Sequence, residues 1–252
     1  MATPPSSRPS APSTSSTSAT SATLRTASAP SAAEAALDFV QDGMKLGLGT
    51  GRAAAAFVEA LGARVAQGLR VTGVPTSEAT AALARRLSIP LARLDEVPRL
   101  DVTFDGADEV DPKLDVIKGY GAAMVREKIV ARSSERLVIL VGPEKLVKQL
   151  GERGRLPIEV LPFGRALVER ELARLGLASA VRLAANGEPV VTDNGNLVLD
   201  AELRPPLDAR GLEQAICTLP GVLGTGFFLD MADAVIVGSD DAVELRRRPG
   251  RG

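Results

Sequence analysis

The stretch that decides the fold is Thr103-Phe-Asp-Gly-Ala-Asp-Glu-Val-Asp-Pro112. The apolar run from Leu100 to Phe104 ends abruptly in acidic and small residues, which predicts a buried strand that leads into a loop at its carboxyl end. In open α/β sheets, ligands bind at the carboxyl ends of the strands. We therefore expect this loop to form part of a ligand site.

The segment after this loop adds a cation and a helix. It continues through Val116 and Ile117 to Lys118-Gly119-Tyr120-Gly121, after which apolar residues keep a helical spacing and place Glu127 about two turns into the helix. Glycines just before a helix expose its first backbone N–H groups, which favour a bound anion. Together, the cation, the carboxylates and these N–H groups are suited to moving protons on a small anionic substrate.

Strands and helices alternate through the first half of the chain. We predict helices over residues 32–40, from 52 onwards and over 76–87, with strands at residues 45–49, 71–75, 89–91, 100–104 and 136–141. A further short helix is expected over residues 145–150. This alternation predicts an α/β fold with a doubly wound parallel sheet.

From Pro157 onwards the pattern is that of a small α+β domain. A strand over residues 158–160 and a helix over 166–175 precede Asn194-Gly195, a strong hairpin signal between two short apolar runs. We assign residues 156–206 to this smaller domain, with an antiparallel sheet. A helix over 207–217 and strands near 227–229 and 235–237 are expected to return to the large domain, which then comprises residues 31–155 and 207–245.

The overall composition excludes several kinds of chemistry. The 252 residues include no histidine, so serine–histidine triads, cysteine–histidine pairs and histidine-ligated metal sites are impossible. Cys217 is the single cysteine, which excludes an intrachain disulfide and a cysteine zinc cluster. Lys plus Arg (30) nearly balance Asp plus Glu (31), which gives no electrostatic reason to expect nucleic acid or a membrane surface as partner. Acid–base work must fall to carboxylates, lysine or tyrosine.

Residues 1–30 differ from the rest of the chain. They are mostly Ser, Thr, Ala and Pro, with Arg8 and Arg25 as the only charged side chains. Such a segment cannot bury enough apolar surface to offset its conformational entropy, so we predict a disordered tail. A transit peptide is the alternative, because no acidic residue precedes Glu34, although no amphipathic arginine-bearing helix is evident. We expect a dispensable tail on a cytoplasmic protein without a membrane span, with organellar targeting left open.

A set of motifs, all in family order, resembles ribose-5-phosphate isomerase of the A type. The central motifs are Asp105-Gly-Ala-Asp-Glu-Val-Asp111 and Lys118-Gly-x-Gly, followed by Arg126-Glu-Lys-Ile-Val130. The remaining motifs are Gly47-Leu-Gly-Thr-Gly51, Gly73-Val-Pro-Thr-Ser77, Pro157-Ile-Glu-Val160, Thr192-Asp-Asn-Gly-Asn196 and Pro220-Gly-Val222. The resemblance covers the chain except for the N-terminal tail and the last few residues.

The resemblance implies a Rossmann-like large domain, a ferredoxin-like smaller domain and a homodimer or homotetramer. It implies an aldose–ketose isomerase of the non-oxidative pentose phosphate pathway, which interconverts ribose 5-phosphate and ribulose 5-phosphate through an enediolate. Neither a metal nor another cofactor is expected.

The resemblance also assigns roles to individual residues. Glu127 would be the catalytic base, Lys118 would stabilise the oxyanion, and Asp105 and Asp108 would help to open the furanose ring and bind sugar hydroxyls. We hypothesise that the helix holds Glu127 partly away from water and so raises its pKa. Substrate contacts would come from Thr50, Gly51, Arg52, Ala53, Asp105, Gly106, Ala107, Asp108, Lys118, Gly119, Tyr120, Gly121 and Lys145.

Several positions depart from the family pattern. Arg52 and Ala53 stand where serine and threonine normally follow Gly-Thr-Gly, and Tyr120 replaces a glycine. The segment Gly142-Pro-Glu-Lys145 replaces an aspartate-x-serine-lysine motif, and a family lysine has no counterpart near Pro30. These changes affect the expected phosphate contacts. Arg52 can compensate, because a guanidinium binds phosphate through two parallel hydrogen bonds.

The same residues permit other interpretations. The spaced aspartates could form an ordinary hydrophilic loop, and Glu127 could be an exposed ion-pair residue; a calcium loop fails the EF-hand spacing. The alternative function is a non-catalytic sugar-phosphate sensor, although no helix-turn-helix or basic patch precedes the domain. An amino-sugar phosphate isomerase or a coenzyme A transferase would leave Lys118-Gly-x-Gly with Arg126-Glu-Lys-Ile unexplained.

Overall fold

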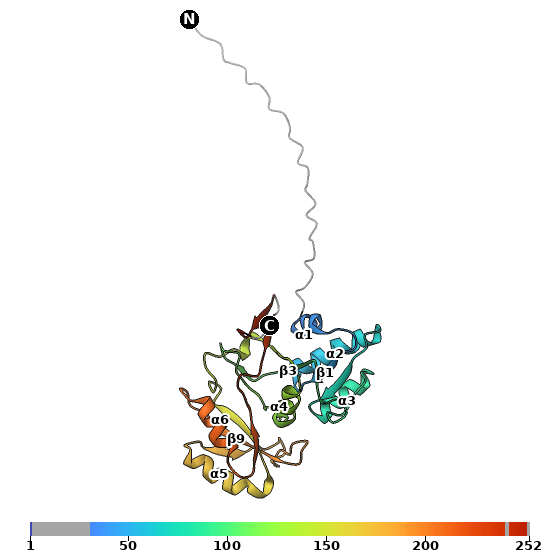
Figure 1. Cartoon of the computed structure of the whole chain (residues 1–252). Helices are drawn as coiled ribbons and strands as arrows, with labels where there is room; N and C mark the ends of the chain where they lie inside the picture. The colour runs from blue at the N-terminus through green and yellow to red at the C-terminus, as the bar shows by residue number, and fades with distance from the viewer. Residues whose placement is uncertain (2–30, 240–241, 251–252) are drawn as a thin grey trace.

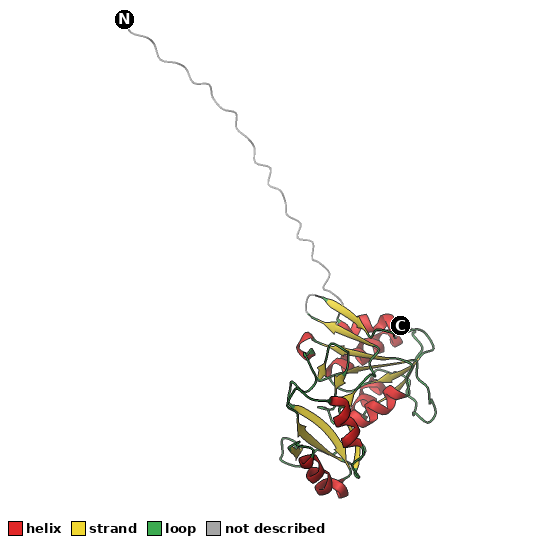
Figure 2. Ribbon diagram, turned by 60° about the vertical axis from the view of Figure 1, so that its left-hand side comes forward, coloured by secondary structure: helices red, strands yellow, loops and turns green. Residues whose placement is uncertain are grey.

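The computed structural model describes residue 1, residues 31–239 and residues 242–250 (Figures 1 and 2). The prediction of a disordered tail concerns residues outside this described part. Within it, no helix combines the length and the apolar character needed to cross a membrane.

A six-stranded sheet forms the centre of the large unit. Its strand order is β13-β12-β6-β3-β1-β2, and all neighbours are parallel except for the edge strand β13. The strands are β1 (Lys45–Leu48), β2 (Thr72–Pro75), β3 (Val102–Gly106), β6 (Leu137–Val141), β12 (Ala234–Gly238) and β13 (Val243–Arg247). The doubly wound parallel sheet predicted from the alternation of elements is confirmed.

Helices cover both faces of this sheet because the side chains of its strands alternate. In β6, Val138 and Leu140 belong to the core beneath the first helices, whereas Ile139 and Val141 belong to the core on the opposite face. The first face carries α1 (Ala32–Ala36), α2 (Arg52–Ala66) and α3 (Glu78–Arg86), and the opposite face carries α4 (Met124–Arg132). A buried strand between two helical layers therefore reads as an almost continuous apolar run.

The smaller unit is a four-stranded antiparallel sheet with two helices. Its elements follow in the order β7-α5-β8-β9-α6-β10, and its strand order is β10-β7-β9-β8. Their bounds are β7 (Arg155–Val160), α5 (Arg165–Arg174), β8 (Ser179–Val181), β9 (Leu197–Glu202), α6 (Ala209–Cys217) and β10 (Val222–Thr225). This β-α-β-β-α-β arrangement confirms the ferredoxin-like fold. The whole unit lies in the sequence between β6 and β12.

The expected return of residues 207–217 to the large domain is wrong. Leu212 and Ile216 of α6 join the core of the small sheet, and β10 pairs antiparallel with β7 from Val222 to Thr225. The physical reason is that the small sheet is incomplete without these elements. Helix α6 helps to cover its apolar face, and β10 adds the fourth strand. A domain boundary at residue 206 would separate α6 and β10 from the rest of the unit.

Smaller differences concern individual elements. The helix expected over residues 145–150 is absent, because only a 3-10 turn, Pro143–Lys145, forms there. Residues 89–91 form no strand and contribute one bridge, from Leu91 to Gly73. The edge strand β13 was not predicted, and a three-stranded sheet of β4 (Glu109–Val110), β5 (Val116–Ile117) and β11 (Phe227–Phe228) connects the two units.

The sheet order creates a crevice at the carboxyl end of β1. Strand β1 lies between β2 and β3, and the connection after β1 runs to β2 on one side, whereas the connection after β3 runs to β6 on the other side. At such a switch point the loops after the two strands separate and leave room for a ligand. Here these are the loops after Leu48 and after Gly106, the two glycine-containing segments singled out in the sequence.

Candidate active site

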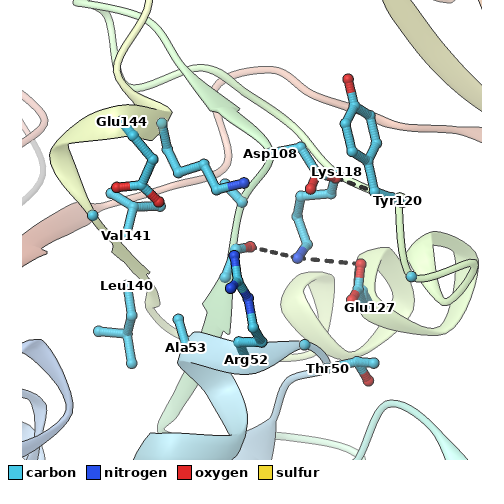
Figure 3. A pocket seen from close by; sticks show the side chains of 17 residues that line it. Thr50, Arg52, Ala53, Asp108, Lys118, Tyr120, Glu127, Leu140, Val141 and Glu144 are labelled. Atoms are coloured by element: carbon cyan, nitrogen blue, oxygen red, sulfur yellow. Dashed lines mark hydrogen bonds and ion pairs between the residues drawn. The ribbon is translucent and has the colours of Figure 1, made fainter. Parts of the chain in front are cut away.

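A cavity of about 620 Å³ lies at this crevice. Its wall contains Glu127 and every predicted substrate-contact residue except Asp105, namely Thr50, Gly51, Arg52, Ala53, Gly106, Ala107, Asp108, Lys118, Gly119, Tyr120, Gly121 and Lys145. Residues from the loops after β1, β3 and β6, and from the start of α4, thus surround one space (Figure 3).

Lys118 is the centre of the site. Its ammonium group lies 3.0 Å from Oδ1 of Asp105 and 3.2 Å from Oε2 of Glu127, and it donates a 2.6 Å hydrogen bond to the carbonyl of Gly106. The side chains of all three ionisable residues are at most 5% exposed. Burial by itself lowers the pKa of Lys118, but the two carboxylates outweigh burial and raise it, so Lys118 is a fixed cation.

Asp105 lies beneath the cavity and not on its wall. Its Oδ1 accepts hydrogen bonds from the backbone N–H groups of Thr50 and Gly106 in addition to the contact with Lys118. A side chain at Gly49 would overlap the Asp105 carboxylate, so glycine is required where β1 passes this residue. Three contacts thus converge on Oδ1 of Asp105 and hold Lys118 and the loop after β1, whereas the expected contact of this carboxylate with sugar hydroxyls stays a prediction.

Glu127 is buried in the first turn of α4, one turn closer to the helix start than we expected. Burial, reinforced by the nearby Asp105 carboxylate and only partly offset by Lys118, raises the pKa of Glu127 to about 8. Its Oε2 forms an ion pair with the Lys118 ammonium group at 3.2 Å and has no well-aligned hydrogen bond among the described residues. A carboxyl group in this setting can both take up and release a proton near neutral pH.

The loop that carries Lys118 is held in a strained shape. Ala122 has a φ of 62°, in the left-handed region that non-glycine residues rarely adopt. Asp108 Oδ2 accepts a hydrogen bond from the backbone N–H of Tyr120, and Arg182 donates to the carbonyls of Gly119 and Tyr120. The small sheet therefore fixes the backbone of this loop from outside the cavity.

Tyr120, which departs from the family pattern, packs outside the reacting centre. Its ring lies 3.8 Å from the guanidinium carbon of Arg155, and Figure 3 shows it pointing away from Glu127. Arg155 and Arg182 both pair with Asp200 of β9. The tyrosine thus occupies a cation–π contact with the small sheet.

Hydroxyl groups support the loop after β1. The Thr50 hydroxyl lies 2.7 Å from that of Thr76 and donates to the Ser77 hydroxyl at 2.8 Å. Thr80 hydrogen-bonds to the carbonyl of Gly49 and lies near the same cluster. Ser77 also caps α3, so one residue both begins this helix and holds Thr50.

The end of the cavity opposite Glu127 is cationic. Arg52, exposed at the start of α2, projects into the cavity in Figure 3. Lys145 lines the same cavity from the turn after β6. Sequence reasoning missed four lining residues, Leu140, Val141, Gly142 and Glu144. They surround the predicted Lys145, and the end of the β6 strand signal could have indicated them.

Comparison with known proteins gives the family. The family model for ribose 5-phosphate isomerase A (phosphoriboisomerase A) matches residues 72–242. A ribose-5-phosphate isomerase A from Roseiflexus sp. (strain RS-1) is 52% identical over 222 residues, which cover 87% of this chain and 95% of that protein. The chain belongs to the ribose 5-phosphate isomerase A family. The expected family membership is therefore confirmed, and this member is an enzyme of the isomerase type.

Solved structures of ribose 5-phosphate isomerase A agree with this fold. The structure of the enzyme from Methanocaldococcus jannaschii matches this chain with a TM-score of 0.82 and 41% sequence identity. The match covers 86% of this chain and 96% of the chain in that structure. A D-ribose-5-phosphate isomerase in complex with phospho-erythronic acid has a TM-score of 0.83 and 41% identity, with the same coverage of 86% and 96%. Both structures are similar to this chain across both units.

Proposed function

We propose that the cavity interconverts ribose 5-phosphate and ribulose 5-phosphate through an enediolate, with Glu127 as the base. The observation that carries this proposal is the buried contact between Glu127 and Lys118, 3.2 Å apart on the wall of one cavity. A carboxyl group with a pKa near neutrality and a permanent cation are the two groups that proton transfer beside a carbonyl requires.

In the forward direction, the ionised Glu127 removes the proton from C2 of the open-chain aldose. The C2–H electron pair forms the C1–C2 double bond, and the carbonyl electrons move to O1, which gives the enediolate. The same carboxyl group then returns its proton to C1, which takes up the electron pair of the double bond, while the proton of O2 moves to O1, so that O2 becomes the ketose carbonyl and O1 a hydroxyl group. No group is gained or lost overall, so one base suffices for both carbon steps.

Lys118 stabilises the negative charge that develops on the substrate oxygens. Asp105 and the Gly106 carbonyl hold its ammonium group in place, so little reorganisation is needed when the charge forms. Asp108, half-buried on the cavity wall, binds sugar hydroxyls and assists ring opening. Asp105 acts in our proposal by holding Lys118.

The phosphate group binds at the cationic end of the cavity. Arg52 and Lys145 offer guanidinium and ammonium donors, and the backbone N–H groups at the start of α2 face the same space. Arg52 thus takes over a function for which the family pattern supplies hydroxyl groups. This arrangement places the phosphate away from Glu127 and leaves the carbonyl end near Lys118.

The test is an isomerisation assay with purified protein and ribose 5-phosphate in the presence of a chelator. We expect ketose to form, and we expect Glu127→Gln to lower kcat by about a hundredfold to ten-thousandfold, because the amide cannot accept the proton. Equal activity of the variant would remove Glu127 as the base. A wild-type protein that binds ribose 5-phosphate without turnover would be a sugar-phosphate sensor instead.

We also infer a homodimer or homotetramer acting in the cytoplasm, as the family resemblance and the composition predict. Light scattering coupled to size-exclusion chromatography measures the assembly, and a single monomeric peak would contradict it. Fluorescent fusions with and without residues 1–30 test the compartment, since a targeting tail would relocate only the longer fusion.

A further inference from the structure

Two of the motifs in the sequence take no part in the cavity. These are Pro157-Ile-Glu-Val160 on β7 and Thr192-Asp-Asn-Gly-Asn196 in the turn before β9. The structure brings them together through Glu159, whose side chain is fully buried. Its Oε1 accepts hydrogen bonds from Thr192 Oγ1 at 3.0 Å, Asn194 Nδ2 at 2.9 Å and Asn196 Nδ2 at 2.8 Å.

Burial of the Glu159 carboxylate is unfavourable to the free energy of folding, although it stabilises the turn. Its second oxygen, Oε2, is buried without a hydrogen-bond partner within the described residues, and unpaired buried charge opposes folding. What the carboxylate achieves is a single fixed conformation of the turn, since three donors converge on one oxygen atom. The question is therefore what this turn holds in place.

The outer side of the turn forms hydrogen bonds with Arg126 of α4. Asn194 Oδ1 accepts from Arg126 Nε at 2.8 Å, and the Asp193 carbonyl accepts from Arg126 Nη2 at 2.7 Å. The Asp193 carboxylate accepts a 2.8 Å hydrogen bond from the backbone N–H of Glu78 at the start of α3, and the Glu78 side chain also pairs with Arg126. One turn of the small sheet is thus attached to two helices of the large unit.

Both attachment points adjoin the active site. Arg126 directly precedes Glu127 in the first turn of α4. Glu78 directly follows Ser77, whose hydroxyl accepts from Thr50 on the cavity wall. The contacts therefore run from Glu159 through Asn194 and Arg126 to the segment that carries the proposed base. Figure 1 shows α4 lying between the large sheet and β9 of the small sheet, where such a link is possible.

We propose that Glu159 and Asn194 are positioning residues that fix the first turn of α4 and thereby hold Glu127 in register with Lys118. The inference rests on the proposed role of Glu127 as the base. Neither residue touches the cavity, so their effect is on the rate of proton transfer and not on substrate binding. A displacement of about 1 Å at a reacting group is sufficient to lower a rate by about a hundredfold.

Asn194 offers the most discriminating test because the two ends of its amide contact groups of opposite charge. Its oxygen faces a guanidinium and its nitrogen faces a carboxylate. Asn194→Asp keeps the acceptor for Arg126 and the side-chain shape, but it places a negative charge against Glu159. The residue is exposed in a turn, so the variant leaves the core intact.

The matched control is Asn186→Asp, in another turn of the small unit. Asn186 Nδ2 donates to Glu188 Oε2 at 3.0 Å, so the same substitution again brings a carboxylate against a glutamate. Asn186 and Glu188 are exposed, and among the described residues neither forms a hydrogen bond or ion pair with α4. A second pair of variants, Glu159→Ala and Glu159→Gln, asks whether an acceptor at Oε1 is what matters, since glutamine retains one.

The measurements are kcat, KM and the pH profile of kcat/KM for each variant, together with the thermal midpoint. We expect Asn194→Asp to lower kcat by about tenfold to a hundredfold with little change in KM, and to move the profile to lower pH because Glu127 becomes less buried. Asn186→Asp should change none of these. Glu159→Gln should recover most of the kcat that Glu159→Ala loses.

The outcomes separate this inference from the proposed function. A wild-type kcat and pH profile for Asn194→Asp, combined with an inactive Glu127→Gln, would overturn the positioning role and leave the base assignment intact. A fully active Glu127→Gln would overturn both. Arg126→Gln provides a second route if a Glu159 variant does not fold, and combining it with Asn194→Asp should lower kcat no further than Arg126→Gln alone.

Discussion

At the scale of single residues, the site depends on three buried charges whose balance is incomplete. Lys118 faces both Asp105 and Glu127, so with both acids ionised one negative charge would remain in a nearly water-free space. The net charge of these three side chains is zero when Glu127 holds a proton, which agrees with its raised pKa. Glu127 can therefore act as a base only after it has lost this proton, either at higher pH or when substrate binds.

The first prediction concerns the pH dependence of the reaction. Since Glu127 must be ionised to accept the C2 proton and its pKa is raised to about 8, kcat/KM should rise with pH and level off above about 8. Initial rates with ribose 5-phosphate between pH 5.5 and 9.5 measure this. A profile that is already flat at pH 6 would show that the free enzyme holds Glu127 ionised.

The same proton makes folding stability depend on pH. The folded protein retains the Glu127 proton up to about pH 8, whereas the unfolded chain releases it near the ordinary value of 4.5. Protonation therefore stabilises the folded state, and the free energy of unfolding should fall as pH rises between these values. Urea unfolding of wild type and Glu127→Gln should show a smaller fall for the variant, and parallel curves would contradict this.

Arg52 is predicted to bind the substrate phosphate. Arg52→Ala should raise KM by about tenfold or more with a smaller effect on kcat, because a charge-assisted hydrogen bond is lost at a distance from the reacting carbons. Steady-state kinetics with ribose 5-phosphate measure both constants. Arg64→Ala, an exposed arginine further along α2, is the control, and a KM equal to that of wild type in Arg52→Ala would reject this role.

At the scale of elements, the small sheet contributes to the active site without lining it. Arg182, next to β8, donates to two carbonyls of the loop between β5 and α4 while its guanidinium pairs with Asp200 on β9. The turn before β9 holds α4 through Arg126. Loop and helix, which carry Lys118 and Glu127, are thus each secured by a different part of the same sheet.

Removal of the Arg182 side chain should loosen the loop that carries Lys118. Arg182→Ala leaves the carbonyls of Gly119 and Tyr120 without this donor and Asp200 with only the more distant Arg155, so we expect a loss of about 2–4 kcal/mol in unfolding free energy. The kcat should also fall. Denaturant unfolding and steady-state kinetics test this, with the exposed Arg174 of α5 as the control; equal stability of both variants would contradict it.

At the scale of the whole molecule, one structural unit interrupts another. Strands β6 and β12 are parallel neighbours in the large sheet, yet the entire β7–β10 unit lies between them in sequence. The three-stranded sheet of β4, β5 and β11 joins the two, and β11 follows directly on the end of β10. Loops of the large unit line the cavity, and the small unit holds the loop and the helix that carry Lys118 and Glu127, so the active site depends on how the two units are packed together.

The packing predicts which segments open together. Because α6 and β10 complete the core of the small sheet, their amides should exchange with solvent at the same denaturant dependence as those of β7 and β9. Native-state hydrogen exchange in low concentrations of guanidinium measures this by segment. If α6 exchanged in step with β12 of the large sheet, the division of the chain at its observed place would be wrong.

Local patterns predicted most of the fold, and the family resemblance named residues that the structure brings to one cavity, but neither predicted the parts that depend on distant pairing. The apolar strands β3 and β6 and the glycine turns were readable because burial on both faces leaves a continuous apolar run. Strand β13, Val-Glu-Leu-Arg-Arg, alternates apolar and charged residues over only four positions, a signal too short to identify a strand without its pairing with β12. Similarly, the burial of Asp105 beneath Lys118 arises from three separate segments and leaves no periodic signal.

The interruption of the large sheet by the small unit also has a consequence for synthesis. A ribosome delivers β1 to β6 first, then the whole β7–β10 unit, and only afterwards the β12 strand that must lie against β6. Until then, the apolar edge of β6 stays open, and an unpaired strand edge of this kind invites pairing with another nascent chain. The edge closes only when β12 pairs with β6, so slower synthesis of the intervening segment should lengthen the time during which nascent chains can associate.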